Sequence, residues 1–416
     1  MATLTPAPPP VKFTTHHHLR QRLVLATLCG RPVHISQIRS NSLRPGLTDY
    51  EYSFLRLLDH ITNGSIIEIS TTGTAILYRP GLIAGNNGKP VKHTVPEGCT
   101  RGVTYFLEPL CALAPFSKAP FNVLLDGGVI TAATEDDYSV DTLRTAVLPL
   151  LANFDIGRNI EVRINRRSSA GKGSDGKFSP GAGEVHLTFG HQVRLPKTLH
   201  LVNPGRVKRI RGVAYVTGVS AGNNQRMIEA ARSLLNQYIN DILIHADSSS
   251  AQHVISSYGY SNHSTANTST QKKKVGTGYG MSLMAETSTS CLYAADTFAS
   301  PGEAPEDVGL RVAQMLLQEI SLGGCIGRTG LPLVMTMMTM GMEGDVGRVM
   351  LGKGVIGPEL IQGWRDVKTI MGGGEVVIRE WEGMDGVGSG TGRAKGEGLV
   401  VGVVGRGVGN IGRKVA

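Results

Sequence analysis

Hydrophobic positions along the chain recur alternately at helical and at strand spacing, and the two patterns follow one another several times. Apolar positions at helical spacing predict helices over 19–29, 139–154, 224–238, 308–320 and 358–370. A further helix is predicted behind Thr48, because Glu51 stands three residues later in the spacing of a capping box. Alternating or short apolar runs predict strands over 32–38, 65–70, 74–78, 159–164, 241–246, 280–286, 331–338 and 375–379. Repeated helix–strand units of this length indicate an α/β (α+β) fold with internal structural repeats.

The segment 190–300 begins and ends in turns and has its own strand–helix–strand pattern, so we interpret it as a smaller inserted α/β domain. The larger domain would then comprise 15–189 and 301–416, and the Pro-rich start, 1–14, would be a disordered tail. Stretches rich in Gly, Ser, Thr or Lys predict mobile loops at 165–180, 248–275 and 382–398.

Charge is unevenly distributed along the 416 residues. The formal net charge is +9, and the segment from Arg158 to Arg211 alone holds twelve Lys or Arg against three acidic residues. A concentrated basic segment indicates an acidic polymer or surface as partner. The alternative is a solvated basic loop, which charge alone does not exclude.

Several classes of protein are excluded at this stage. No apolar run reaches the roughly 18 residues that a membrane-spanning helix needs, and the first residues do not have the form of a signal peptide. The five cysteines are scattered without a Cys-x-x-Cys pair, which is typical of a reducing compartment and predicts no metal site. A Gly-x-Gly-x-x-Gly match at 407–412 leaves no room for the helix that would hold a dinucleotide, so we expect no cofactor.

The most informative motifs lie in order along nearly the whole chain. They are Ile38-Arg-Ser-Asn-Ser-Leu-Arg-Pro-Gly-Leu47, Tyr105-Phe-Leu-Glu-Pro109, Leu113-Ala-Pro-Phe-Ser-Lys118, Gly183-Glu-Val-His-Leu187, Gly212-Val-Ala-Tyr215, Gly327-Arg-x-x-Leu-Pro332 and Arg365-Asp-Val-Lys368. Together they resemble the RNA 3′-terminal phosphate cyclase family, and within it the nucleolar branch that lacks cyclase activity. The resemblance implies a large domain of repeated βαβαββ-type units with a smaller inserted α/β domain.

The cyclases of that family activate an RNA 3′-phosphate through an adenylated histidine, which requires a nucleophilic imidazole. The resemblance places Gln362 at or next to that position, and no histidine follows His263. An amide cannot form the phosphoramidate, so we predict that the chain is not a cyclase. Arg39 and Arg44 are candidate phosphate or anion contacts, with ordinary surface arginines as the equal alternative.

Arg365, Asp366 and Lys368 match an Arg-Asp-x-Lys motif that the resemblance links to cleavage of pre-ribosomal RNA. Asp366 could act as the general base on a ribose 2′-hydroxyl, with the two cations stabilising the charge on phosphorus. The alternative is a solvated helix turn whose charged side chains contact phosphate or protein, and we favour it because such spacing is common on exposed helices.

By this resemblance we expect a ribosome biogenesis factor of the small-subunit processome, needed for pre-rRNA processing toward 18S rRNA, in the nucleus and nucleolus. The implied partners are a large ribosome-biogenesis GTPase, pre-ribosomal RNA and other processome proteins, with no membrane contact. A pre-rRNA endonuclease is the alternative function. The basic segment at the entry to the inserted domain, Arg206, Lys208, Arg209 and Arg211, is the candidate docking surface for either partner.

Overall fold

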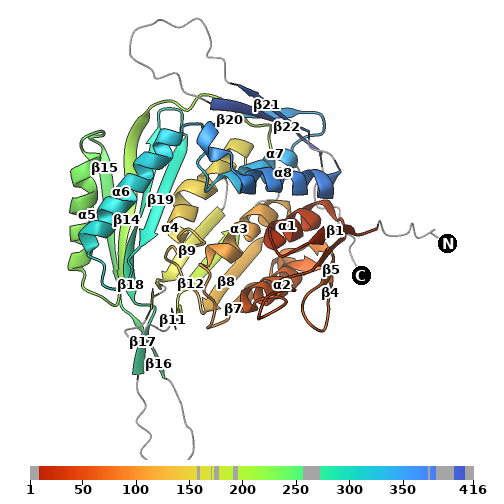
Figure 1. Ribbon diagram of the computed structural model, residues 1–416, viewed down its shortest axis with the longest axis horizontal. Coiled ribbons are helices and arrows are strands. Elements are labelled where there is room, and N and C mark those ends of the chain that lie inside the picture. Colours follow the sequence, from red (N-terminus) through yellow and green to blue (C-terminus); the bar gives the residue numbers. More distant parts are fainter. Residues whose placement is uncertain are drawn as a thin grey trace, which may run out of the picture.

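The computed structural model describes residues 9–156, 160–169, 171–172, 178–190, 195–255, 272–372, 375–380 and 398–407. Within these residues the chain forms mixed α/β layers, which confirms the predicted fold class (Figure 1). No helix in these ranges is long and apolar enough to cross a bilayer.

Three βαβαββ units build the larger part of the molecule. The first contains β1 (Val11–Thr14), α1 (Leu19–Cys29), β2 (Val33–Ser36), α2 (Asp49–Ile61), β4 (Ile66–Ile69) and β5 (Ile76–Arg79). The second contains β7 (Val91–Val95), α3 (Thr104–Leu113), β8 (Phe121–Gly127), the helical stretch that begins with α4 (Val140–Thr142), β9 (Ile160–Arg166) and β12 (Glu184–Phe189). The third contains β13 (His200–Leu201), α7 (Leu331–Thr339), β20 (Val346–Gly352), α8 (Pro358–Met371), β21 (Val376–Glu380) and β22 (Gly398–Val404).

The three sheets share one topology. Their strand orders are β1-β2-β5-β4, β7-β8-β12-β9 and β13-β20-β22-β21. In each sheet the first two strands run parallel and the remaining neighbours antiparallel. A parallel pair needs a crossover connection, and the first helix of each unit lies within that crossover. Each unit therefore repeats the same arrangement.

The insert separates β13 from α7 in the third unit. It contains β14 (Val207–Thr217), α5 (Gly222–Leu235), β15 (Ile242–Ser249), β18 (Gly278–Thr287), β19 (Leu292–Phe298) and α6 (Pro305–Leu322), with strand order β15-β14-β18-β19. Helices α5 and α6 pack against each other and against this sheet, and Figure 1 shows them side by side. Their apolar side chains and those of the sheet form a separate hydrophobic cluster.

Two domain boundaries predicted from the sequence are wrong. Strand β13 pairs with β20, so 200–201 belongs to the third unit and not to the insert that we expected to begin at 190. Helix α6 packs on the insert sheet, so the insert extends beyond the expected end at 300. The predicted tail 1–14 is also corrected at its end, because β1 pairs in parallel with β2.

The predicted strand 331–338 is the helix α7 instead. Its residues are apolar on every side because the helix is buried, and a short apolar run does not distinguish a buried strand from a buried helix. The methionines Met335, Met337 and Met338 fill the core, whereas Met342 is exposed.

Some predicted loops fall partly outside the described residues. In 165–180 the structure describes the short pair β10 (Gly171–Lys172) and β11 (Phe178–Ser179). In 248–275 it describes β16 (Gln252–Ile255) paired with β17 (Lys272–Val275). Residues 256–271 and nearly all of 382–398 lie outside the description.

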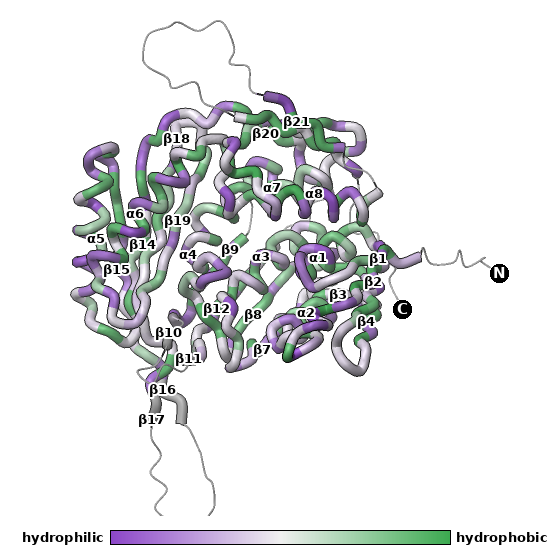
Figure 2. The backbone as a smooth tube through the Cα atoms, in the orientation of Figure 1, coloured by the Kyte–Doolittle hydropathy of each residue, from purple (hydrophilic) through white to green (hydrophobic). Residues whose placement is uncertain are grey.

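One continuous hydrophobic core runs through the three units. In Figure 2 the hydrophobic colour follows the inner strands and α1, while hydrophilic residues mark outer helices such as α5. Helix α1 is buried along most of its length, including the charged residue Arg22. A buried charge requires a partner, and that partner lies in α8.

Candidate functional site

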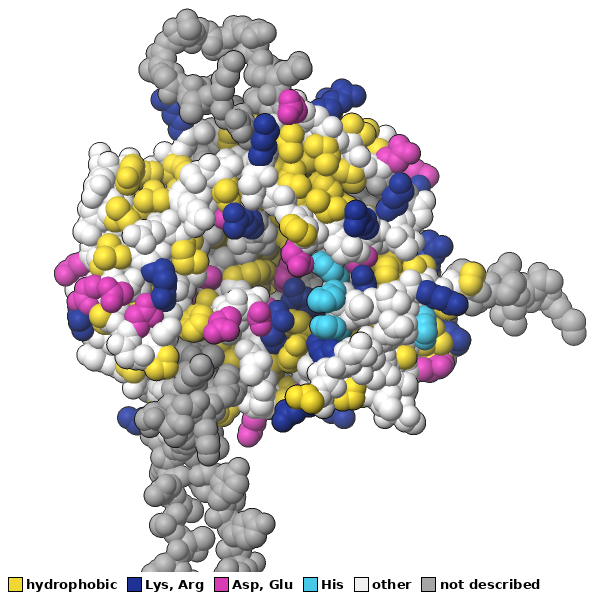
Figure 3. Space-filling view, viewed as in Figure 1, with side chains coloured by type: hydrophobic (Ala, Val, Ile, Leu, Met, Phe, Trp, Pro, Cys, Tyr) yellow, Lys and Arg dark blue, Asp and Glu magenta, His cyan; other side chains and the backbone are white. Residues whose placement is uncertain are grey.

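A cleft of about 680 Å³ lies where helices of all three units meet. Helices α1, α3, α7 and α8 contribute most of its lining, together with the connections that lead into α7 and α8. Figure 3 shows a hollow near the centre of this face with histidine side chains beside it. The repeated architecture therefore brings residues that are far apart in the sequence around one cavity.

The first turns of α1, α7 and α8 border this cleft. Within the described structure, the residues that precede these helices, His18, Gly330 and Gly357, form no side-chain cap. The N-terminus of a helix carries unpaired N–H groups and a partial positive charge. The cleft is therefore suited to an anionic group.

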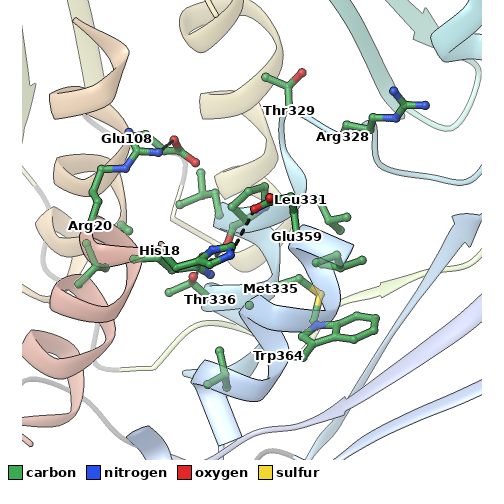
Figure 4. A pocket seen from close by; sticks show the side chains of 18 of the residues that line it. His18, Arg20, Glu108, Arg328, Thr329, Leu331, Met335, Thr336, Glu359 and Trp364 are labelled. Carbon is green, nitrogen blue, oxygen red and sulfur yellow. Dashed lines mark hydrogen bonds and ion pairs between the residues drawn. The ribbon is translucent and has the colours of Figure 1, made fainter. Parts of the chain in front are cut away.

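Arg20 and Glu108 form an ion pair on one wall of the cleft (Figure 4). The Arg20 Nη2 atom donates to Glu108 Oε2 at 2.8 Å, and Nη1 donates to the Tyr105 carbonyl at 2.8 Å. Burial raises the pKa of Glu108 above its ordinary value, although Arg20 opposes this shift. Glu108 therefore combines a fixed position with an increased affinity for a proton.

Two further polar groups of the cleft have no partner in the described part of the chain: the hydroxyl of Tyr138 and the indole Nε1 of Trp364. A buried donor without a partner costs free energy, which a bound ligand or water would recover. At the mouth, His18 Nε2 lies 3.2 Å from Glu359 Oε2 (Figure 4). Of these cleft residues, only Glu108 lies in one of the sequence motifs, and the motif assigned it no role, because the role follows from packing between units.

The candidate catalytic residues of α8 do not point the same way. Arg365 and Lys368 are exposed, whereas Asp366 is 1 % exposed. Asp366 accepts hydrogen bonds from Arg22 Nε at 2.8 Å and Nη2 at 3.4 Å, and from Gln362 Nε2 at 2.9 Å. Its carboxylate therefore joins α8 to α1.

Gln362, the residue expected near the position of the cyclase histidine, is part of this buried network. Its amide orients Asp366 and offers no nucleophile. His18 is the sole imidazole among the described residues that line the cleft, and it comes from the start of α1 and not from α8.

A second cavity, lined by both members of the Arg22–Asp366 pair, shares no lining residue with the central cleft. It has a volume of about 640 Å³ and is formed by the edge of the first sheet and by α8. Its lining includes Lys12, His34 and Arg365, together with Arg22 and the Asp366 carboxylate that pairs with it. Lys368 is not part of this lining. We call this cavity the α8 basin.

Arg39, one of the two candidate anion contacts, is already hydrogen-bonded to nearby residues of the same chain. Its guanidinium makes two hydrogen bonds to Glu51, at 2.7 and 2.8 Å, and a third to the Gly46 carbonyl. Glu51 also completes the predicted capping box at Thr48, which the structure confirms. Arg44 is exposed and its side chain remains available.

The candidate docking surface is partly neutralised by acidic residues from elsewhere in the chain. Arg209 pairs with Glu286, and Arg211 pairs with Asp241. Lys208 and Arg206 are exposed. Within the described residues, the basic segment is therefore a weaker source of positive field than its sequence suggests.

Comparisons with known proteins agree with this architecture. A family model described as RNA 3′-terminal phosphate cyclase matches residues 11–373. A mouse protein named RNA 3′-terminal phosphate cyclase-like protein is 41% identical over 362 residues, which cover 84% of this chain and 85% of its own. The rRNA processing protein rcl1 of Schizosaccharomyces pombe is 39% identical over 360 residues, which cover 86% of this chain and 89% of its own. The rRNA processing protein RCL1 of Saccharomyces cerevisiae is 35% identical over 365 residues, which cover 88% of this chain and 89% of its own.

The family match covers the first two units, the insert and the third unit as far as the end of α8, and these relatives align over most of their own length as well. The chain belongs to the RNA 3′-terminal phosphate cyclase family.

Proposed function

We propose that this protein is a ribosome biogenesis factor that supports pre-rRNA processing toward 18S rRNA and performs no RNA cyclisation. Two relatives that align over most of their length are named rRNA processing proteins. The observation that carries the proposal is the buried network of Arg22, Gln362 and Asp366. In this network the α8 residues are the Gln362 amide and the Asp366 carboxylate, which is already hydrogen-bonded. A cyclase would need a free imidazole in this part of α8, and a nuclease would need a free general base.

The alternative, a pre-rRNA endonuclease, requires Asp366 to take a proton from a ribose hydroxyl. A general base must come within hydrogen-bond reach of that proton. Three N–H groups already occupy the Asp366 carboxylate, and its side chain is 2% exposed. We therefore favour RNA contact through the exposed Arg365 and the basin cations over cleavage by this residue.

Within the proposal, the protein acts in the small-subunit processome in the nucleus and nucleolus, bound to a large ribosome-biogenesis GTPase and to pre-rRNA. The α8 basin supports RNA contact, because Lys12 and Arg365 in its lining can bind phosphate, whereas Arg22 is already neutralised by Asp366. The exposed Lys208 at the start of the insert sheet is the part of the candidate docking surface to which this proposal assigns the GTPase.

The test uses Arg365→Ala/Lys368→Ala and keeps Asp366, so that the buried pair stays intact. Cells depleted of the endogenous protein receive this variant or the wild type, and 18S rRNA, recovery of the GTPase and RNA crosslinking are measured. We expect normal recovery of the GTPase and reduced crosslinking. Normal 18S rRNA in depleted cells without any replacement would refute the proposed function.

A second assay separates the enzymatic alternatives. Purified wild-type protein is incubated with a pre-rRNA fragment and, separately, with ATP labelled in the α-phosphate. We expect neither cleavage nor covalent labelling. Cleavage that disappears in the double variant would establish the endonuclease, and a covalent adenylate would establish the cyclase.

A further inference from the structure

A third pocket, of about 430 Å³, lies between the second unit and the insert. The connection before α4 supplies Thr134, Glu135 and Asp136, and the insert supplies the start of β18 and the segment that follows β19. In Figure 1 this is the end of the insert sheet nearest the β16–β17 hairpin. The pocket shares no lining residue with the central cleft or the α8 basin.

The pocket is acidic. Glu135 and Asp136 are exposed, and none of the described residues that line the pocket is Lys or Arg. The nearest ion-pair contact of Asp136 is with Arg101 at 3.9 Å, but that guanidinium makes its short bonds, at 2.6 and 2.7 Å, to Asp137. The negative charges of Glu135 and Asp136 at the pocket are therefore only weakly neutralised by nearby cations among the described residues.

The remaining lining offers aromatic and hydroxyl groups. Tyr279 and Phe298 are half-buried, and the Tyr279 hydroxyl is already engaged with the Glu303 carbonyl. Ser169 is 2 % exposed, and its Oγ finds no hydrogen-bond partner in the described part of the chain. Gly278 lies directly against Ser169, since an added Cβ would come within 2.8 Å of the Ser169 Cβ. The lining of the pocket thus combines an unsatisfied hydroxyl with aromatic and acidic residues.

We propose that this pocket receives an arginine side chain from a protein partner. A guanidinium is planar, carries five N–H donors and stacks on aromatic rings, so it matches carboxylates, hydroxyls and rings together. Its donors would pair with Glu135 and Asp136 and would satisfy the Ser169 oxygen. Lysine offers a point charge without the planar face, so it fits this lining less well.

The surroundings favour a residue within a polypeptide over a free small cation. Val219 lines the pocket and is 38% exposed, and the exposed Pro301 lines it as well. Residues that flank an arginine in a peptide would cover these apolar side chains, whereas free arginine would leave them in water. RNA is disfavoured because its phosphates would be repelled by the two carboxylates. The proposal does not depend on the function proposed above.

The test uses a fluorescein-labelled peptide, Gly-Val-Arg-Val-Gly-amide, with matched peptides that carry lysine or citrulline at the centre. Citrulline keeps the shape of arginine and removes its charge. Binding to the full-length protein is measured by fluorescence anisotropy, with free arginine methyl ester as competitor. The pocket variant is Glu135→Gln/Asp136→Asn, and the matched control, Glu343→Gln/Glu375→Gln, changes the charge equally at exposed sites outside the pocket lining.

We expect the arginine peptide to bind at least tenfold more tightly than the citrulline peptide, and more tightly than the lysine peptide. The pocket variant should lose at least tenfold in affinity and the control should not. Ser169→Ala should weaken binding severalfold while leaving the thermal midpoint equal or higher, because it removes an unsatisfied buried hydroxyl. The proposal would be overturned if the arginine peptide did not bind, or if the citrulline peptide bound as tightly as the arginine peptide. It would also be overturned if the pocket variant bound the arginine peptide as tightly as the wild type, or if free arginine methyl ester competed as strongly as the unlabelled peptide.

Discussion

Removal of the Asp366 carboxylate is predicted to destabilise the whole fold. In the Asp366→Ala variant, Arg22 keeps its charge in a site where its side chain is 6% exposed, and it loses both of its hydrogen bonds to the carboxylate. Breaking a buried ion pair by deleting one partner costs about 3–5 kcal/mol. A typical domain has only about 5–15 kcal/mol of stability, so the loss should be large. Urea unfolding, followed by circular dichroism, measures it directly.

The same helix supplies the control. Arg365→Ala and Lys368→Ala alter exposed side chains, and each should change the free energy of unfolding by no more than about 0.5 kcal/mol. The double variant Arg22→Met/Asp366→Leu replaces the pair by apolar groups and should recover most of the stability lost in the single variant. A cost below about 1 kcal/mol for Asp366→Ala would refute the assignment of this carboxylate to the α1–α8 contact.

Three further predictions concern other charged groups. The Arg167 guanidinium is held by the buried Asp141 carboxylate of the second unit, at 2.6 and 3.0 Å, and also pairs with Asp247 of the insert. Asp141→Asn should therefore weaken the junction between the second unit and the insert by about 1.5–3 kcal/mol, because Arg167 loses one of its two charged partners. Urea unfolding with hydrogen exchange across the junction measures this loss, and unchanged exchange would contradict it. Burial lowers the pKa of His93 to about 4, below the ordinary value of about 6.5, so the unfolded chain takes up the proton first as the pH falls. The free energy of unfolding should therefore drop by about 3 kcal/mol between pH 6.5 and pH 4, and a His93→Gln variant should lack this part of the acid dependence in urea titrations at several pH values. Lys208→Gln should reduce the salt dependence of RNA or GTPase binding more than Arg211→Gln does, since Arg211 is already paired; equal slopes in a salt titration would contradict this.

Local sequence signals predicted the elements that local interactions determine. The capping box of Thr48 and Glu51 marks the start of α2, and in the structure the Thr48 backbone N–H donates to Glu51 Oε2 at 2.8 Å. The apolar periods over 19–29 and 358–370 correspond to α1 and α8. These patterns arise within one or two helical turns, so a single segment of sequence contains the information.

The domain boundaries depended on contacts between distant segments and could not be predicted in the same way. Strand β13 is two residues long and pairs with β20 across the whole insert, so nothing near His200 in the sequence marks it as part of the third sheet. Helix α6 has the amphipathic pattern of any surface helix, and only its packing on the insert sheet assigns it to the insert.

The ion-pair partners of the charged residues in the candidate sites were the feature that the sequence predicted least well. Arg22 and Asp366 lie 344 positions apart in the sequence, so neither shows that the other will neutralise it. In the basic segment, Arg209 is paired by a glutamate from β18. A net charge counted along the chain therefore overstated the field at the surface.

This compensation changes how variants of the α8 motif are to be interpreted. An alanine triple variant of Arg365, Asp366 and Lys368 removes two exposed cations and one half of a buried pair. Loss of rRNA processing in that variant would be expected from destabilisation alone, because the α1–α8 contact is broken whether or not any RNA is cut. The Arg365→Ala/Lys368→Ala variant removes the two exposed cations and keeps the buried Arg22–Asp366 pair. A processing defect in this variant at unchanged stability would therefore be evidence for RNA contact at α8.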